Sequence, residues 1–124
     1  MFGLFKSSLL YLKIFPDKIE ITNLATGEVL ARTAQTKFSN SRLLIAEFRP
    51  AEDLARSILR ELGLSNKSSK ILIQQMVVAD EVLSEAEKRT LRDLCEAIGA
   101  KKVLIATNSE PLSQEQALEI LKTN

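Results

Sequence analysis

The clearest pattern of apolar and polar positions runs through residues 82–106. Apolar residues recur at three- and four-residue spacing and give one face of a helix: Leu91, Leu94, Cys95 and Ile98. Ser84 and Glu87 precede them in the S-x-x-E spacing of a capping box, and Gly99 stands where a left-handed residue ends a helix. The pattern predicts a helix from Ser84 to Gly99, followed by a buried strand at residues 103–106.

The first third of the chain predicts strands. Residues 9–14 are rich in apolar side chains and residues 18–22 alternate strictly, with a Pro-Asp turn between them. A second turn, Asn-Leu-Ala-Thr-Gly, leads to a third strand at residues 28–33. We therefore expect a three-stranded meander, followed by a polar loop at residues 34–42.

The middle and the end of the chain add further elements. A helix is expected to start near Pro50, with Glu52 and Asp53 in its first turn, and to close at Gly63. Residues 71–73 form a short apolar run typical of a buried strand. A last helix is expected to follow an S-x-x-Q capping box at Ser113 and Gln116.

The predicted order is β-β-β-α-β-α-β-α. With right-handed crossovers it gives an α/β fold, in which a mixed sheet containing a three-stranded meander has helices on both faces. This is a ribonuclease H-like arrangement, and 124 residues fit a single domain, 1–124.

Composition narrows the function classes. Seventeen basic and 16 acidic residues give a net charge of +1, so no electrostatic footprint for nucleic acid is present. Histidine is absent, which removes the commonest general base. The one cysteine, Cys95, lies on the apolar helix face and is interpreted as a buried hydrophobic residue in a reducing compartment. No apolar run reaches the ~18–20 residues of a membrane span. These features predict a cytoplasmic protein without a signal peptide.

Three stretches resemble one known family. The segment EKRTLRDLCEAIGAKKV at residues 87–103 is similar, without gaps, to a helix and strand in the first domain of MreB, the bacterial actin homologue that determines rod shape. Residues 45–48 (IAEF) with Glu52, and the opening residues 1–5 (MFGLF), resemble the family in the same order. The resemblance implies an actin-like half-domain equivalent to the first subdomain (IA-type), without the second half that completes the family's ATP cleft.

The resemblance also implies that the ATPase motifs have been lost. Where the family carries Asp-Leu-Gly-Thr to hold phosphate and metal, this chain has Leu12-Lys13-Ile14-Phe15. Neither a β-branched residue nor phenylalanine allows the close backbone approach of a phosphate site. The nearby Asp17 is interpreted as a turn residue. We therefore expect no catalytic residue, no metal and no cofactor.

The family's Glu-Glu-Pro, which helps to position the hydrolytic water, becomes residues 107–109 without gaps. A two-residue insertion restores only Glu110-Pro111. We interpret Glu110 as a carboxylate at a helix N-terminus, with a catalytic role as the weaker alternative.

The N-terminus is the candidate contact with a membrane or a partner. It combines apolar residues with one cation: Met1, Phe2, Leu4, Phe5 and Lys6. Family members use such a terminus at the inner membrane, so a weak peripheral contact is one interpretation. The alternative is that these residues pack on the sheet edge or form a disordered end.

The expected function is a non-catalytic structural or protein-interaction module linked to the bacterial cell-shape cytoskeleton. Its partner would be an MreB-type filament or a second copy in a homo-oligomer. The alternative is a nucleotide-binding half-site completed by dimerisation or by a second polypeptide. A nuclease is disfavoured because it needs clustered carboxylates, whereas the strands carry Leu12, Ile14, Ile19 and Ile21.

Overall fold

The computed structural model describes residues 7–65, 67–76 and 83–124. Within these residues the chain forms five strands and three helices in the predicted order. The elements are β1 (Ser8–Phe15), β2 (Lys18–Asn23), β3 (Glu28–Thr33), α1 (Phe48–Glu61), β4 (Ser69–Gln75), α2 (Glu85–Ala97), β5 (Ala100–Ala106) and α3 (Gln114–Thr123).

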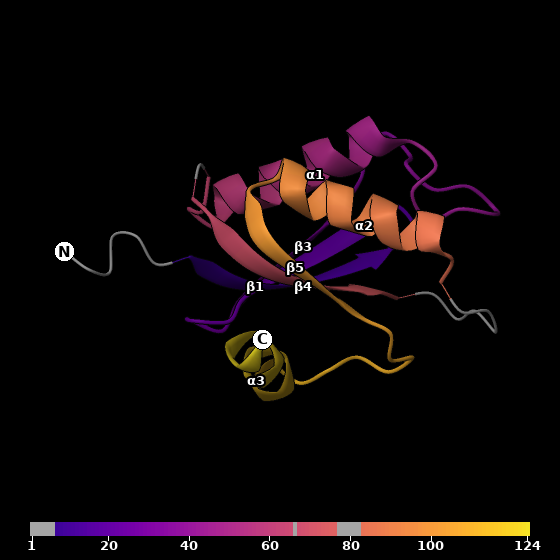
Figure 1. Cartoon of the computed structure of the whole chain (residues 1–124). Helices are drawn as coiled ribbons and strands as arrows, with labels where there is room; N and C mark the ends of the chain where they lie inside the picture. The colour runs from indigo at the N-terminus through magenta and orange to yellow at the C-terminus, as the bar shows by residue number, and fades with distance from the viewer. Residues whose placement is uncertain (1–6, 66, 77–82) are drawn as a thin grey trace.

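The strands form one mixed sheet in the order β3-β2-β1-β4-β5. The meander β1-β2-β3 is antiparallel, whereas β4 pairs with β1 and with β5 in parallel. Helices α1 and α2 cover one face of the sheet and α3 lies on the other (Figure 1). The predicted mixed sheet with helices on both faces is confirmed.

Two clusters of buried side chains flank the sheet because successive residues of a strand point to opposite faces. Leu12 and Ile14 of β1 pack with Ile71 of β4 in the larger core, under α1 and α2. Tyr11 and Leu72 point the other way, toward α3, and form the smaller core. Strands β1 and β4 are thus covered on both faces, which explains their nearly continuous apolar runs.

The ends of α2 follow the sequence signals. The Ser84 hydroxyl accepts a hydrogen bond from the Glu87 backbone N–H at 3.1 Å, and the Glu87 carboxylate accepts one from the Ser84 backbone N–H at 3.0 Å. Gly99 has φ +109°, and a Cβ there would lie 3.1 Å from the Lys67 carbonyl oxygen. The predicted capping box and glycine terminus are both confirmed.

The start of α1 differs from the prediction. The helix begins at Phe48, two residues before Pro50, so Glu52 and Asp53 lie in the second turn rather than the first. Pro50 is tolerated inside the first turn because the backbone N–H that it lacks would have no partner within the helix. The N-cap residue, Glu47, makes no side-chain capping bond, so the sequence carries no local signal for this start.

Candidate functional site

The candidate site is the carboxyl end of the central strands, where open α/β sheets bind ligands. Residues 12–15 of β1, where the resemblance to MreB led us to expect the loss of a phosphate motif, are part of the packed sheet. Leu12 and Ile14 are 0% exposed in the larger core. On the opposite face, the Lys13 ammonium lies 3.2 Å from a Glu20 carboxylate oxygen. The Phe15 ring lies under the Lys18 ammonium, 4.7 Å from the ring centroid. Two of these side chains thus belong to the larger core, and the other two make surface contacts.

Asp17 has a structural task beside this segment. It follows Pro16 with φ +57°, the combination that a type II turn requires. Its Oδ1 accepts three hydrogen bonds of 2.9 Å, from the backbone N–H groups of Phe38 and Ser39 and from the Ser39 hydroxyl. These donors, the Ser39 backbone N–H foremost, lower the pKa of the Asp17 carboxyl below its usual 3.8 although partial desolvation opposes them. The interpretation as a turn residue is confirmed, and the carboxylate also anchors the loop that carries buried Phe38.

A buried polar network occupies the far side of the sheet. The Tyr11 hydroxyl donates to Gln74 Oε1 and accepts from the Leu112 backbone N–H at 3.0 Å. Gln74 Nε2 donates to the carbonyl oxygens of Asn108 at 2.9 Å and Glu110 at 2.8 Å. Tyr11 and Gln74 are 1% and 0% exposed, respectively. The network therefore fastens the segment between β5 and α3 onto β1 and β4.

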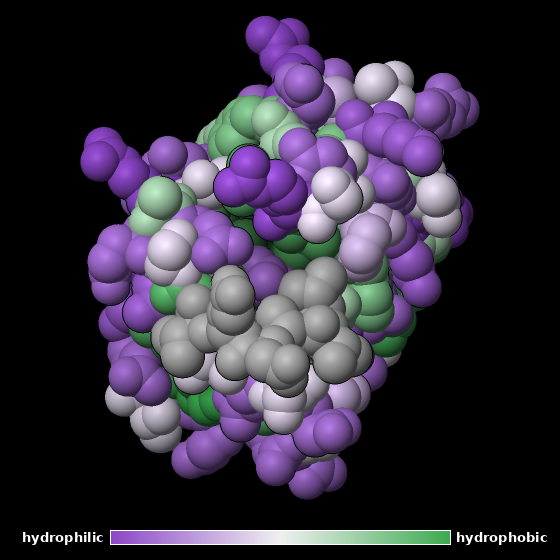
Figure 2. Space-filling view, turned by 90° about the vertical axis from the view of Figure 1, so that its right-hand side faces the viewer, coloured by the Kyte–Doolittle hydropathy of each residue, from purple (hydrophilic) through white to green (hydrophobic). Residues whose placement is uncertain are grey.

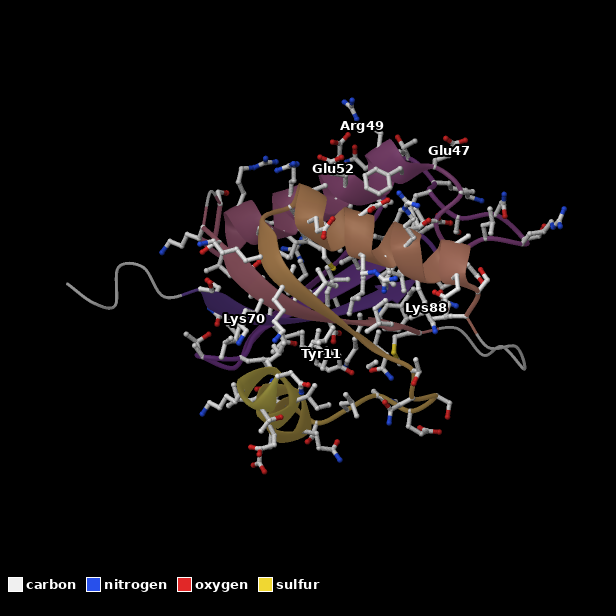
Figure 3. The ribbon with its side chains drawn as sticks, viewed as in Figure 1. Tyr11, Glu47, Arg49, Glu52, Lys70 and Lys88 are labelled. Atoms are coloured by element: carbon white, nitrogen blue, oxygen red, sulfur yellow. The ribbon has the colours of Figure 1, made fainter. Side chains whose placement is uncertain are left out.

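Figure 3 shows Tyr11 between the sheet and α3, within the molecule rather than at its surface. Sequence reasoning did not assign a role to this tyrosine. The feature that could have indicated this network is Gln74, a polar residue directly after the apolar run at residues 71–73. Its partner Tyr11 lies 63 residues away in the chain, so no local pattern connects the two. A buried amide of this kind needs a donor and acceptors nearby. The fold supplies the donor from β1, as the Tyr11 hydroxyl, and the acceptors from the segment after β5, as the Asn108 and Glu110 carbonyls.

Glu110 is exposed, and its backbone carbonyl accepts the Gln74 bond. Helix α3 has Ser113 as its N-cap and Glu115 as the acid of its first turn. The interpretation of Glu110 as a helix N-terminal carboxylate is therefore wrong, because the capping box of Ser113 and Gln116 fixes the helix start three residues later. A catalytic role for Glu110 stays a prediction.

A small apolar groove lies between the loop before α1 and the first turns of α2, on the end of the molecule that Figure 2 faces. Its volume is about 160 Å³. It is lined by Leu43, Leu44, Ile45, Gln75, Ala86, Glu87, Thr90 and Leu91. Its one carboxylate, Glu87, already serves the capping box of α2. Residues 77–82, which lie between β4 and α2 in the sequence, are outside the described part of the chain.

The other candidates can be placed briefly. Cys95 is buried as predicted, and burial raises the pKa of its thiol far above the usual value, with a smaller contribution from Glu96. In residues 7–65, 67–76 and 83–124, no three His, Cys, Asp or Glu side chains are grouped to hold a metal ion. The N-terminal candidates Met1, Phe2, Leu4, Phe5 and Lys6 lie outside the described residues.

The described residues thus define a mixed α/β protein. At the carboxyl end of its central strands, they form core contacts and a buried hydrogen-bond network. No family model and no curated protein matches the chain. Among the helices of the described residues, none has both the length and the apolar character needed to traverse a bilayer.

Proposed function

We propose that this chain is a non-catalytic, ribonuclease H-like domain of actin type that serves as a protein-interaction module of the bacterial cell-shape cytoskeleton. The strand order supports the fold assignment: the meander places β1 beside β2, and the crossover through α1 returns β4 to the other side of β1. The MreB-like segment at residues 87–103 supports the cytoskeletal link, since it covers most of α2 and the start of β5.

One observation carries the non-catalytic part of the proposal. The residues aligned with the phosphate motif, Leu12 and Ile14, are fully buried in the larger core. A phosphate site there would need a close backbone approach and a carboxylate for the metal, and both core side chains exclude that arrangement. Asp17, the nearest carboxylate in sequence, is held by Phe38 and Ser39. These residues therefore support a packing role better than they support nucleotide chemistry.

Two measurements test the proposal. Isothermal titration of the full chain with Mg²⁺ and ATP is expected to give no heat of binding. Co-sedimentation with purified MreB-type filaments is expected to bring the chain into the pellet in a saturable way, with unpolymerised subunits as the matched control. Binding or turnover of ATP would overturn the non-catalytic part and favour the completed half-site. Absence from the pellet at saturating filament would overturn the cytoskeletal part.

The N-terminal residues add a membrane arm to the proposal. Four apolar residues and Lys6 give at most weak and reversible binding to a bilayer. Flotation with anionic vesicles is expected to recover a small fraction of the chain, and the double variant Phe2→Ser, Phe5→Ser is expected to remove it. Equal flotation of both chains would contradict a role for this terminus.

A further inference from the structure

The outer edge of β3 is an open strand edge. In the described part of the chain, β3 pairs with β2 on one side and with nothing on the other. Its side chains are half-buried or exposed, and Val29, at 45% exposure, is among the most exposed large apolar residues described. An edge with free backbone groups is a template for pairing with another strand.

The register shows which backbone groups are available. The Ala34 N–H donates to the Asp17 carbonyl at 2.8 Å, one step beyond the Thr33–Lys18 pair. In an antiparallel ladder hydrogen-bonded pairs alternate with non-bonded ones, so the even-numbered residues of β3 bond to β2. Val29, Ala31 and Thr33 therefore direct their N–H and C=O groups outward. The Ala31 carbonyl agrees, since it accepts a hydrogen bond from the exposed Arg32 guanidinium at 2.8 Å.

We infer that two copies of this chain associate by antiparallel pairing of their β3 strands about a two-fold axis at Leu30. In this register Val29 of one copy lies opposite Ala31 of the other, and both have outward backbone groups, as a hydrogen-bonded pair requires. Leu30 lies opposite itself. Glu28 lies opposite Arg32 of the second copy, and symmetry makes that pair twice. The result is a continuous sheet through both copies.

Charge complementarity selects this register over its neighbours. Moving the axis to Ala31 keeps the outward groups paired but places Arg32 opposite Leu30 and leaves Glu28 outside the β3 ladder. Directly opposed charges of opposite sign stabilise an antiparallel pair, whereas like charges destabilise it. The axis at Leu30 is therefore the one that satisfies both the backbone and the charges of β3.

Arg32 covers this edge in the isolated chain, and its contacts are weak enough to be exchanged. Its guanidinium also lies 2.8 Å from a Glu61 carboxylate oxygen of α1, with both side chains nearly half exposed. Exposed pairs of this kind contribute little to stability. Turning the guanidinium toward Glu28 of a second copy frees the Ala31 carbonyl for the new ladder. A six-residue edge is a small interface, so we expect a dissociation constant on the order of 100 µM.

The inference names a partner for the interaction module and to that extent rests on the proposed function, but its test is separate from ATP or filament binding. Sedimentation equilibrium of the full chain up to ~1 mM is expected to show a monomer–dimer equilibrium. Ala31→Pro removes an outward N–H without touching the β2 ladder and is expected to weaken association at least ~10-fold. Ala31→Ser keeps the N–H and is the matched control, expected to dimerise like the parent chain.

A pair of charge variants tests the register. Glu28→Arg alone and Arg32→Glu alone each oppose like charges across the two-fold axis, and each is expected to dimerise roughly 5-fold or more weakly. Mixed together, the two variants face each other with opposite charges and are expected to form a heterodimer of at least parental affinity. Circular dichroism of each variant checks the fold. The inference is overturned if the parent chain stays monomeric up to ~1 mM. It is also overturned if the variants dimerise as tightly as the parent chain, or if mixing the two charge variants does not restore the affinity.

Discussion

Replacing Tyr11 by Phe removes one hydroxyl from the interior and keeps the ring. The hydroxyl bridges β1, β4 and the segment before α3 through Gln74 and the Leu112 N–H. Because the ring stays in the smaller core, the change isolates the polar contribution of the network from the packing contribution.

The magnitude follows from the groups left without partners. Gln74 is fully buried, so its Oε1 would lose its hydrogen bond away from water, at a cost of roughly 1–3 kcal/mol. The Leu112 N–H is only partly buried and can be reached by water, so its loss lies near ~1 kcal/mol. We expect Tyr11→Phe to lower the free energy of unfolding by about 2–4 kcal/mol, a large share of the roughly 5–15 kcal/mol of a typical domain. The midpoint of thermal unfolding should fall by roughly 10 °C.

Urea unfolding followed by circular dichroism measures this loss, and a double-mutant cycle assigns it to the network. Gln74→Leu alone leaves the Tyr11 hydroxyl and the carbonyls of Asn108 and Glu110 without their partner. The double variant removes both partners, so its loss should be smaller than the sum of the two single losses by ~1 kcal/mol or more. Stability of Tyr11→Phe within ~0.5 kcal/mol of the parent chain, or strict additivity in the cycle, would refute the reasoning.

Three further predictions follow from contacts described above. Asp17→Asn keeps a residue that tolerates positive φ but removes the negative charge. Because the pKa of Asp17 in the folded chain lies below its ordinary 3.8, the ionised carboxylate stabilises the fold above pH 3.8, and this stabilisation is lost as the pH falls through the native pKa. Urea midpoints of Asp17→Asn and the parent chain should therefore converge below about pH 4, and a constant difference would contradict the anchoring role of the carboxylate. Cys95 should react with a thiol reagent only after unfolding, because its thiol is buried with a raised pKa, and fast labelling of the native chain would contradict this. Ser84→Ala should cost about 1 kcal/mol, since it removes the acceptor for the Glu87 N–H, whereas Ser84→Thr should retain most of the stability; equal losses in the two urea titrations would argue against the cap.

The sequence predicted those features that neighbouring residues determine. The capping boxes at Ser84 and Ser113 each involve residues three positions apart. Gly99, after α2, adopts the positive φ that ends the helix, which is also a local property of the backbone. The alternation that assigns Leu12 and Tyr11 to opposite faces is also local. These signals were enough to predict all the described strands and helices in their correct order.

Contacts between distant residues escaped prediction. Nothing in the neighbourhood of Asp17 indicates that its carboxylate accepts hydrogen bonds from residues 21 and 22 positions later. The early start of α1 at Phe48 has no side-chain capping signal. The residues just before it instead donate their backbone N–H groups to the Phe38 carbonyl, in the loop that Asp17 holds. The contact of Glu110 is also long-range: its backbone carbonyl accepts a hydrogen bond from Gln74, 36 residues earlier in the chain, which no local pattern indicates.

The central position of β1 has a consequence for biosynthesis. The strand is translated before the other described elements, yet its parallel neighbour β4 begins only at Ser69. One side of β1 therefore remains unpaired until β4 has been made. Contacts between distant segments are slow to close because the intervening loop must first lose entropy. The nascent meander therefore exposes Leu12 and Ile14 until α1 and β4 have emerged.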